Sequence, residues 1–140
     1  MKIIICGSIT AAQEIIKLQK QLEEAGHSVE IPEGVRNPTL RRRTEISNIE
    51  KAGDKIKYDL IRNYFEKIKN HDVVVVVNPQ KKGITGYIGG NTLIEMAFAH
   101  VLKKPLYCLY SLPELSYSPE ILAMQPIVLN GDVSDLLNLK

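Results

Sequence analysis

Five consecutive valines, Val73–Val77, constrain the fold of this chain more than any other feature of its sequence. β-branched side chains lose rotamer freedom in a helix and suit an extended strand. The run lacks the polar alternation of a strand with one face in water, so it predicts a strand, beginning at Asp72, that is covered on both faces. Strands of this kind belong to parallel sheets with helices on either side, which indicates an α/β fold.

The rest of the chain alternates apolar strands with amphipathic helices. Strands are predicted at residues 2–6, 27–31, 72–77, 105–109 and 127–129, and helices at residues 11–25, 54–70, 92–103 and 119–124. Residues 32–43 and 78–90 contain glycine and proline and are predicted to be loops. With right-handed crossovers, we expect one domain, residues 1–140: a flavodoxin-like, Rossmann-like three-layer sandwich with a five-stranded parallel sheet in the order 2-1-3-4-5.

Composition narrows the class of protein. The 140 residues include 18 Lys and Arg against 16 Asp and Glu, and 44% are hydrophobic, as in an ordinary globular domain. No stretch approaches the ~20 consecutive apolar residues that span a bilayer, and Lys2–Cys6 is too short for the apolar part of a signal peptide. Cys6 and Cys108 both fall in predicted interior strands, as unpaired thiols in a reducing compartment do. We therefore expect a cytoplasmic protein without a membrane partner.

Positive charge gathers in the middle of the chain, where residues 36–69 carry ten basic and five acidic side chains. Arg36 and the run Arg41–Arg43 suit phosphate, because guanidinium groups bind phosphate oxygens in bidentate fashion. A solvated loop explains the same residues. An RNA-associated domain is a further alternative, and it predicts binding that weakens steeply with salt.

The expected sheet order places a ligand site beyond the carboxyl ends of its strands. In an open α/β sheet, ligands bind where the strand order reverses, here between the first and third strands. Three loops should converge at that edge: residues 7–10, 78–91 and 110–115.

One carboxylate stands out beside those loops. Every side chain of Leu93–Ala99 is apolar except that of Glu95, which follows the glycine pair Gly89–Gly90 and falls in the first turn of the predicted helix. A carboxylate on so apolar a helix either faces a cavity or caps the helix. Thr92 and Glu95 also match the capping box, in which the glutamate bonds back to the backbone of the cap residue. The residues alone leave both interpretations open.

Three blocks resemble the nucleoside 2-deoxyribosyltransferase superfamily, which includes the 2'-deoxynucleoside 5'-phosphate N-hydrolases. They are Ile5-Cys6-Gly7-Ser8-Ile9, the strand Asp72–Val77, and Gly90–Ala99 leading to Lys104-Pro105. The resemblance spans essentially the whole chain and implies a single nucleoside deoxyribosyltransferase-like domain with a five-stranded flavodoxin-like fold. It also implies a nucleoside or nucleotide substrate and a homodimer or higher homo-oligomer, and it implies no metal or organic cofactor.

The resemblance also assigns roles to residues. It implies that Glu95 is the nucleophile that attacks the anomeric carbon and forms a glycosyl-enzyme ester, which water or a second base then resolves. Tyr64 occupies the place of the residue that helps protonate the leaving base. The substrate-binding residues are expected to be Gly7, Ser8, Ile9, Thr10, Asn78, Tyr87, Gly89, Gly90, Asn91 and Thr92.

The chain departs from the family pattern at several places. Where the family often has Asp-x-Gly-Thr, this chain has Gly89–Thr92 and so lacks the aspartate. Where family members often carry an acidic residue that helps protonate the leaving base, this chain has Tyr64. In the first turn, Thr10-Ala11-Ala12 stands where the hydrolases have an arginine and glycines. These changes leave room for a nucleotide-binding protein with a degenerate, non-catalytic pocket. Residues 88–95 also loosely resemble the Pro-Gly-Gly-x-Gly-Thr-x-x-Glu motif of lysine-decarboxylase-like phosphoribohydrolases, a further alternative.

Overall fold

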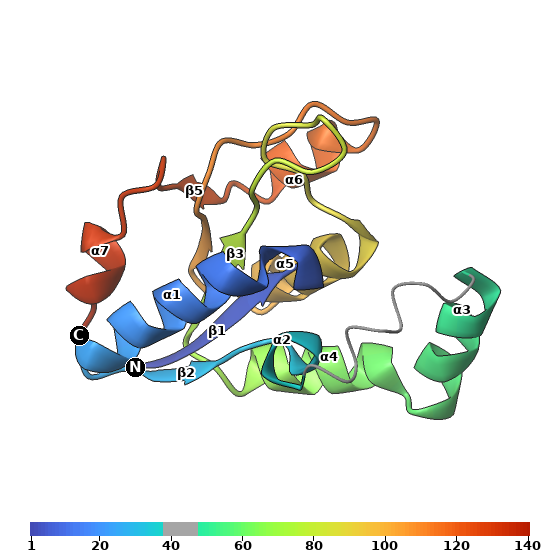
Figure 1. Ribbon diagram of the computed structural model, residues 1–140, viewed down its shortest axis with the longest axis horizontal. Helices are drawn as coiled ribbons and strands as arrows, with labels where there is room; N and C mark the ends of the chain where they lie inside the picture. Colours follow the sequence, from blue (N-terminus) through green and yellow to red (C-terminus); the bar gives the residue numbers. More distant parts are fainter. Residues whose placement is uncertain (38–47) are drawn as a thin grey trace.

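The computed structural model describes residues 1–37 and 48–140, and these form an open five-stranded parallel sheet (Figure 1). The strands are β1 (Lys2–Gly7), β2 (Ser28–Glu30), β3 (Val73–Val77), β4 (Leu106–Cys108) and β5 (Ile127–Val128). Their order is β2-β1-β3-β4-β5. Ile3 pairs with Val73, and Gly7 with Val77. The predicted fold class and strand order are confirmed, and the order reverses between β1 and β3, as the site prediction requires.

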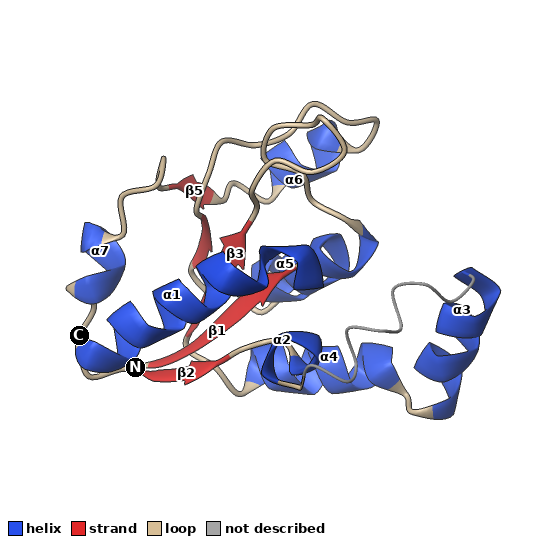
Figure 2. Ribbon diagram, viewed as in Figure 1, coloured by secondary structure: helices blue, strands red, loops and turns tan. Residues whose placement is uncertain are grey.

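Helices cover both faces of the sheet, as Figure 2 shows. They are α1 (Ala12–Glu24), α2 (Glu33–Arg36), α3 (Asn48–Lys57), α4 (Leu60–Lys69), α5 (Gly90–Val101), α6 (Ser118–Ala123) and α7 (Ser134–Leu137), with a short 3-10 helix η1 at Ile9–Ala11. One apolar core joins the sheet to α1, α2 and α7, and a second joins it to α4, α5 and α6. Successive residues of a strand point to opposite faces, so Ile5 belongs to the first core and Cys6 to the second.

The valine strand lies where its composition predicts. Each side chain of Val73–Val77 is at most 2% exposed, and β3 is paired on both sides. Asp72, just before the strand, accepts a hydrogen bond from the backbone N–H of Lys2 at 2.8 Å. Asp72 thus holds β1 and β3 together at the end of the sheet opposite to the expected site.

The prediction of a single helix at residues 54–70 is wrong, because parts of two helices, α3 and α4, occupy this segment. Asp59 adopts a left-handed conformation with φ = 50°, which ends α3 and starts α4 in a new direction. Tyr64, Phe65 and Ile68 still face the body of the protein, but Ile56 is 81% exposed. The helix α3 therefore projects from the body of the molecule (Figure 1).

The predicted loop at residues 32–43 needs a correction as well. Pro32 immediately precedes a single helical turn, α2, which buries Val35. Arg36 ends that turn and lies 3.2 Å from a carboxylate oxygen of Glu30 and 3.5 Å from one of Glu33. Its guanidinium is therefore committed to ion pairs rather than open to a phosphate. The run Arg41–Arg43 lies outside the described residues.

The helix α5 begins two residues earlier than predicted, at Gly90, and Gly89 is its N-cap residue. Thr92 is therefore inside the helix and Glu95 is in its second turn, not the first. No side chain caps the backbone at Gly89. The capping-box interpretation of Thr92 and Glu95 is wrong for this reason. The sequence analysis also did not predict α7.

Among residues 1–37 and 48–140, no helix has both the length and the apolar composition needed to cross a bilayer.

Candidate functional site

The three loops predicted to meet at the carboxyl edge of the sheet do meet there. The buried side chain of Asn78, at the end of β3, donates to the carbonyls of Gly86, Tyr110 and Ser111 at 3.2–3.3 Å. It also accepts from the backbone N–H of Tyr110 at 2.9 Å. The amide of Asn78 thus holds two neighbouring loops together. Its contact with a substrate stays a prediction.

Glu95 extends from the second turn of α5 toward the end of β1. Its Oε2 accepts a hydrogen bond from the Cys6 thiol, with the two atoms 3.1 Å apart. Cys6 is completely buried, whereas Glu95 is only half-buried. The thiol therefore fixes the carboxylate at the point where the strand order reverses.

Burial sets the ionisation of this pair. Desolvation raises the pKa of Glu95 above its usual range, while the hydrogen bond from Cys6 and the positive charges of Lys67 and Lys55 oppose that rise. Burial also raises the pKa of Cys6 well above its usual value, and the negative charge of Glu95 adds to it. The thiol therefore keeps its proton and acts as the donor, which favours the carboxylate form of Glu95.

A pH prediction follows from Lys67. If ionised Glu95 is the reactive form, kcat/KM should fall on the acid side as pH drops through its raised pKa. Substituting Lys67→Met removes a charge that lowers this pKa, so the acidic limb should move to higher pH. The measurement is the pH profile of kcat/KM for both proteins.

The matched control for that experiment is Arg36→Met. Both Lys67 and Arg36 make ion pairs with Glu30 and Glu33. Of these two residues, only Lys67 acts on the pKa of Glu95. An equal displacement of the acidic limb by both substitutions would contradict the assignment of Lys67.

Tyr64 and Asn91 are brought together by Lys55, a residue of α3. Lys55 Nζ donates to Asn91 Oδ1 at 2.8 Å and lies 3.4 Å from the hydroxyl of Tyr64, with the ammonium 5.4 Å from the centre of the tyrosine ring. Burial raises the pKa of Tyr64, and the negative charge of Glu95 raises it further. Tyr64 is therefore within electrostatic reach of Glu95, as its predicted role requires.

The residues of the β1–η1 loop also lie at this edge. A Cβ on Gly7 would come within 2.8 Å of the carbonyl oxygen of Val77, so only glycine allows β1 and β3 to approach this closely. Ser8 accepts hydrogen bonds from Thr10 and from Lys81. The side chain of Ile9 packs against Gly34 of α2.

The two glycines at the start of α5, Gly89 and Gly90, leave open space. A Cβ on Gly90 would meet no atom within 4 Å, and one on Gly89 would meet only the ring of Tyr87, at 3.5 Å. Packing therefore does not require glycine at either position. Tyr87 is half-buried and its ring lies near the ammonium groups of Lys81 and Lys82, whereas Thr92 is buried with 7% exposed.

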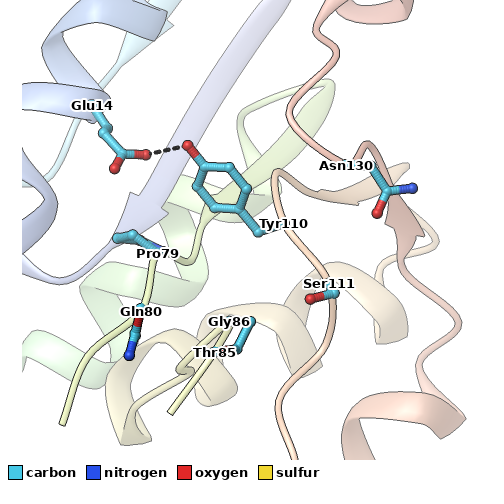
Figure 3. Close-up of a pocket in the computed structure, with 8 residues that line it drawn as sticks. All are labelled: Glu14, Pro79, Gln80, Thr85, Gly86, Tyr110, Ser111 and Asn130. Atoms are coloured by element: carbon cyan, nitrogen blue, oxygen red, sulfur yellow. Dashed lines mark hydrogen bonds between the residues drawn. The ribbon is translucent and has the colours of Figure 1, made fainter. Parts of the chain in front are cut away.

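A hollow opens on the α1 side of the same edge (Figure 3). This cavity, of about 450 Å³, is lined by Glu14, Pro79, Gln80, Thr85, Gly86, Tyr110, Ser111 and Asn130. The hydroxyl of Tyr110 donates to Glu14 Oε2 at 2.7 Å, which raises the pKa of Tyr110 to about 12. Glu95 does not line this cavity, which lies on the other side of β3.

Sequence reasoning missed four contributors to the site: Cys6 as a donor, Lys55, Lys67 and Lys81. Lys55 and Lys67 fall in the segment predicted as one amphipathic helix, residues 54–70, and hydrophobic spacing does not show what a lysine of that helix contacts. For Lys81 the sequence held a usable signal, the glycine at position 83, because glycine favours a tight turn with positive φ.

The sequence comparisons do not identify a family. No protein-family model matches the chain, and no curated protein does. Among the residues that the structure describes, no three His, Cys, Asp or Glu side chains gather into a group suited to a metal ion.

The fold itself has a solved neighbour. The structure is similar to that of a CMP N-glycosidase from Clostridium botulinum, BcmB, with a TM-score of 0.55 and 14% sequence identity. The similarity covers 97% of this chain and 96% of the other. At this identity the two proteins share a fold.

Proposed function

We propose that this protein cleaves, or transfers across, the N-glycosidic bond of a nucleoside or nucleotide, with Glu95 as the nucleophile. The observation that carries the proposal is the Cys6–Glu95 hydrogen bond. This hydrogen bond directs the carboxylate of Glu95 toward the place where the strand order reverses, between β1 and β3, and away from the N-terminus of α5. A carboxylate used only for capping would bond to backbone amides of α5.

The reaction proceeds in two displacements. An oxygen of ionised Glu95 attacks the anomeric carbon, the carbon–nitrogen bond breaks, and the base leaves with the bonding electrons and takes up a proton. Water then adds its oxygen to the anomeric carbon, loses a proton, and releases the glutamate from the ester. The products are the free base and the sugar, or a new nucleoside when a second base replaces water.

Protonation of the leaving base is assigned to Tyr64, supported by Lys55. A tyrosine is a weak acid near neutral pH, and its raised pKa weakens it further. The Lys55 ammonium, 3.4 Å from the tyrosine oxygen, stabilises the phenolate that forms when the proton leaves. This pair takes the place of the acidic side chain that the resembling family carries.

The shared fold supports the proposal that this protein acts on an N-glycosidic bond. The structural neighbour is a CMP N-glycosidase and is similar over nearly the full length of both chains. The same sheet order therefore accommodates cleavage of an N-glycosidic bond in another protein.

Release of free base is the direct test. The protein is incubated with the common ribo- and deoxyribonucleosides and their 5'-monophosphates, and the products are separated by chromatography. We expect base release from at least one substrate, and base exchange when a second free base is added if the protein is a transferase. Tight binding of these compounds without any release would contradict catalysis and support the nucleotide-binding alternative.

The Tyr64–Lys55 pair gives a separate prediction. Substituting Tyr64→Phe should lower kcat about 100-fold, within the usual range for loss of a general acid. The loss should be smaller for bases that leave readily without a proton. The control is Tyr58→Phe, because Tyr58 is also a tyrosine beside a lysine, Lys57, but is half exposed on α3. Equal losses in both variants, or a loss independent of the base, would contradict the role of Tyr64.

A further inference from the structure

Lys81 joins the two loops that end β1 and β3. Its Nζ donates to Ser8 Oγ at 3.0 Å, 73 residues away in the chain. The backbone of Lys81 is fixed by reciprocal hydrogen bonds with Ile84, at 3.1 and 2.9 Å, around a tight turn. Lys82 and Gly83 at the centre of that turn both have positive φ, which is the pattern of a type I' turn. The ammonium therefore projects from a rigid base.

Three donor groups gather at the hydroxyl of Ser8. The backbone N–H of Thr10 lies 3.3 Å, the hydroxyl of Thr10 2.9 Å and the Lys81 ammonium 3.0 Å from Ser8 Oγ. A hydroxyl both donates and accepts, so the Ser8 hydroxyl is itself a further donor at this place. An anion with several acceptor oxygens would accept from these groups together.

The charge of Lys81 is also uncompensated. Over residues 1–37 and 48–140, no carboxylate lies within ion-pair distance of its Nζ, whereas Lys67 pairs with both Glu30 and Glu33. Lys81 is half-buried, with its ammonium 5.6 Å from the centre of the Tyr87 ring. A partly desolvated cation without a carboxylate partner favours an anionic ligand.

Glu95 and Lys81 both contact the end of β1 and the loop that follows it. Glu95 accepts from the thiol of Cys6, and Lys81 donates to Ser8, two residues further along the chain. The Cα atoms of Cys6 and Ser8 are at most about 7 Å apart, the limit for two residues of extended chain. A sugar bound at Glu95 would therefore have Ser8 and Lys81 on the same side of the sheet edge, where its 5'-substituent can reach them.

We propose that Lys81, with Ser8 and Thr10, binds the 5'-phosphate of the substrate and makes the protein selective for nucleoside 5'-monophosphates over nucleosides. This inference rests on the proposed function, because Glu95 fixes the position of the sugar. Lys81 comes from the loop after β3. Its ammonium brings a positive charge to the loop after β1, next to Ser8.

Binding measurements on a non-reacting protein test this directly. In a Glu95→Gln background, titration calorimetry compares each nucleoside with its 5'-monophosphate. We expect the monophosphate to bind about tenfold to 100-fold more tightly, as one charge-assisted contact provides. Lys81→Gln should abolish most of that difference and leave nucleoside affinity unchanged, and Lys81→Arg should retain it. The matched control is Lys82→Gln, which removes the same charge from the next residue and should keep the preference.

The outcomes separate this inference from the proposed function. Equal affinity for nucleosides and monophosphates, or an equal loss for both in Lys81→Gln, overturns the role of Lys81 even if base is released. A Lys81-dependent preference for monophosphates without base release upholds the phosphate site and overturns the catalytic proposal. If Lys81→Gln does not fold, inorganic phosphate is used with the protein carrying Lys81. It should compete with the monophosphate and not with the nucleoside, and failure to compete overturns the inference.

Discussion

Replacing Glu95 by glutamine should abolish base release while leaving the protein at least as stable as before. The amide keeps the size of the side chain and an oxygen that accepts from the Cys6 thiol, but it is not a nucleophile. We expect kcat to fall on the order of 10⁴-fold, the scale seen when a nucleophile is removed from an enzyme. The measurement is base release at saturating substrate, together with thermal melting.

The expected stability of this variant follows from the sign of the pKa shift. The pKa of Glu95 is raised in the folded state by burial, so the folded protein holds the proton more tightly than the unfolded chain does. This contribution to stability is present at pH values below the unfolded pKa and is lost as pH rises through the folded pKa. At neutral pH the ionised carboxylate therefore lowers the free energy of unfolding. Glutamine at position 95 carries no charge and so removes the cost of burying an ionised carboxylate. The difference in Tm between the Glu95→Gln variant and the unsubstituted protein should therefore grow, in favour of the variant, from acid to neutral pH.

Glu14→Gln is the matched control, because it makes the same chemical change at another half-buried carboxylate. Glu14 accepts a hydrogen bond from Tyr110 beside the cavity on the α1 side, away from Glu95. Base release should persist in this variant. If Glu95→Gln instead retained activity and lost about 1 kcal/mol of stability, as loss of a helix cap does, Glu95 would be structural.

The sheet was predictable from the sequence because the composition of its central strands shows that both of their faces are buried. The valines of β3 and the isoleucines of β1 are apolar throughout, and this pattern requires cover on both faces. Once five such strands alternate with helices, few right-handed topologies remain. The observed order β2-β1-β3-β4-β5 follows, and so does the meeting of three loops at one edge.

The break between α3 and α4 was not predictable from the same rules. Hydrophobic spacing continues through residues 56–68, and neither glycine nor proline interrupts it. The interruption is the left-handed conformation of Asp59, which a non-glycine residue adopts at some cost. Tertiary contacts offset that cost, among them the hydrogen bond from Lys55 to Asn91. Hydrophobic spacing reveals neither the hydrogen bond between Lys55 and Asn91 nor the conformational cost at Asp59. The contacts of Lys55 were therefore not predictable from the sequence.

The site was predictable in part for a related reason. Glu95 is identifiable because a lone carboxylate on an apolar helix needs an explanation. Its partner, Cys6, is an ordinary interior residue by sequence, and only the three-dimensional structure brings its thiol within 3.1 Å of the carboxylate. The start of α5 at Gly90 rather than Thr92 then removes the capping-box interpretation of Glu95.

The other large effect is expected from Gly86→Ala, which should destabilise the whole carboxyl edge. Gly86 has φ = 67°, and a Cβ there would lie 1.9 Å from the carbonyl oxygen of Ser111 and 3.3 Å from Asn78 Nδ2. The alanine would force apart the two loops that Asn78 holds together. We expect a loss of about 3 kcal/mol or more in the free energy of unfolding, because strain and overlap act at one buried position. Chemical denaturation measures it.

Gly83→Ala separates the two causes. Gly83 also has a positive φ, 73°, but a Cβ there would meet nothing within 4 Å. Alanine at this position costs only the left-handed conformation, about 1–2 kcal/mol. The difference between the two variants therefore measures the overlap with Ser111. Equal losses would mean that the loops yield freely at Gly86. The hydrogen bonds of Asn78 would then not be what holds the loops after β3 and β4 in place beside the site.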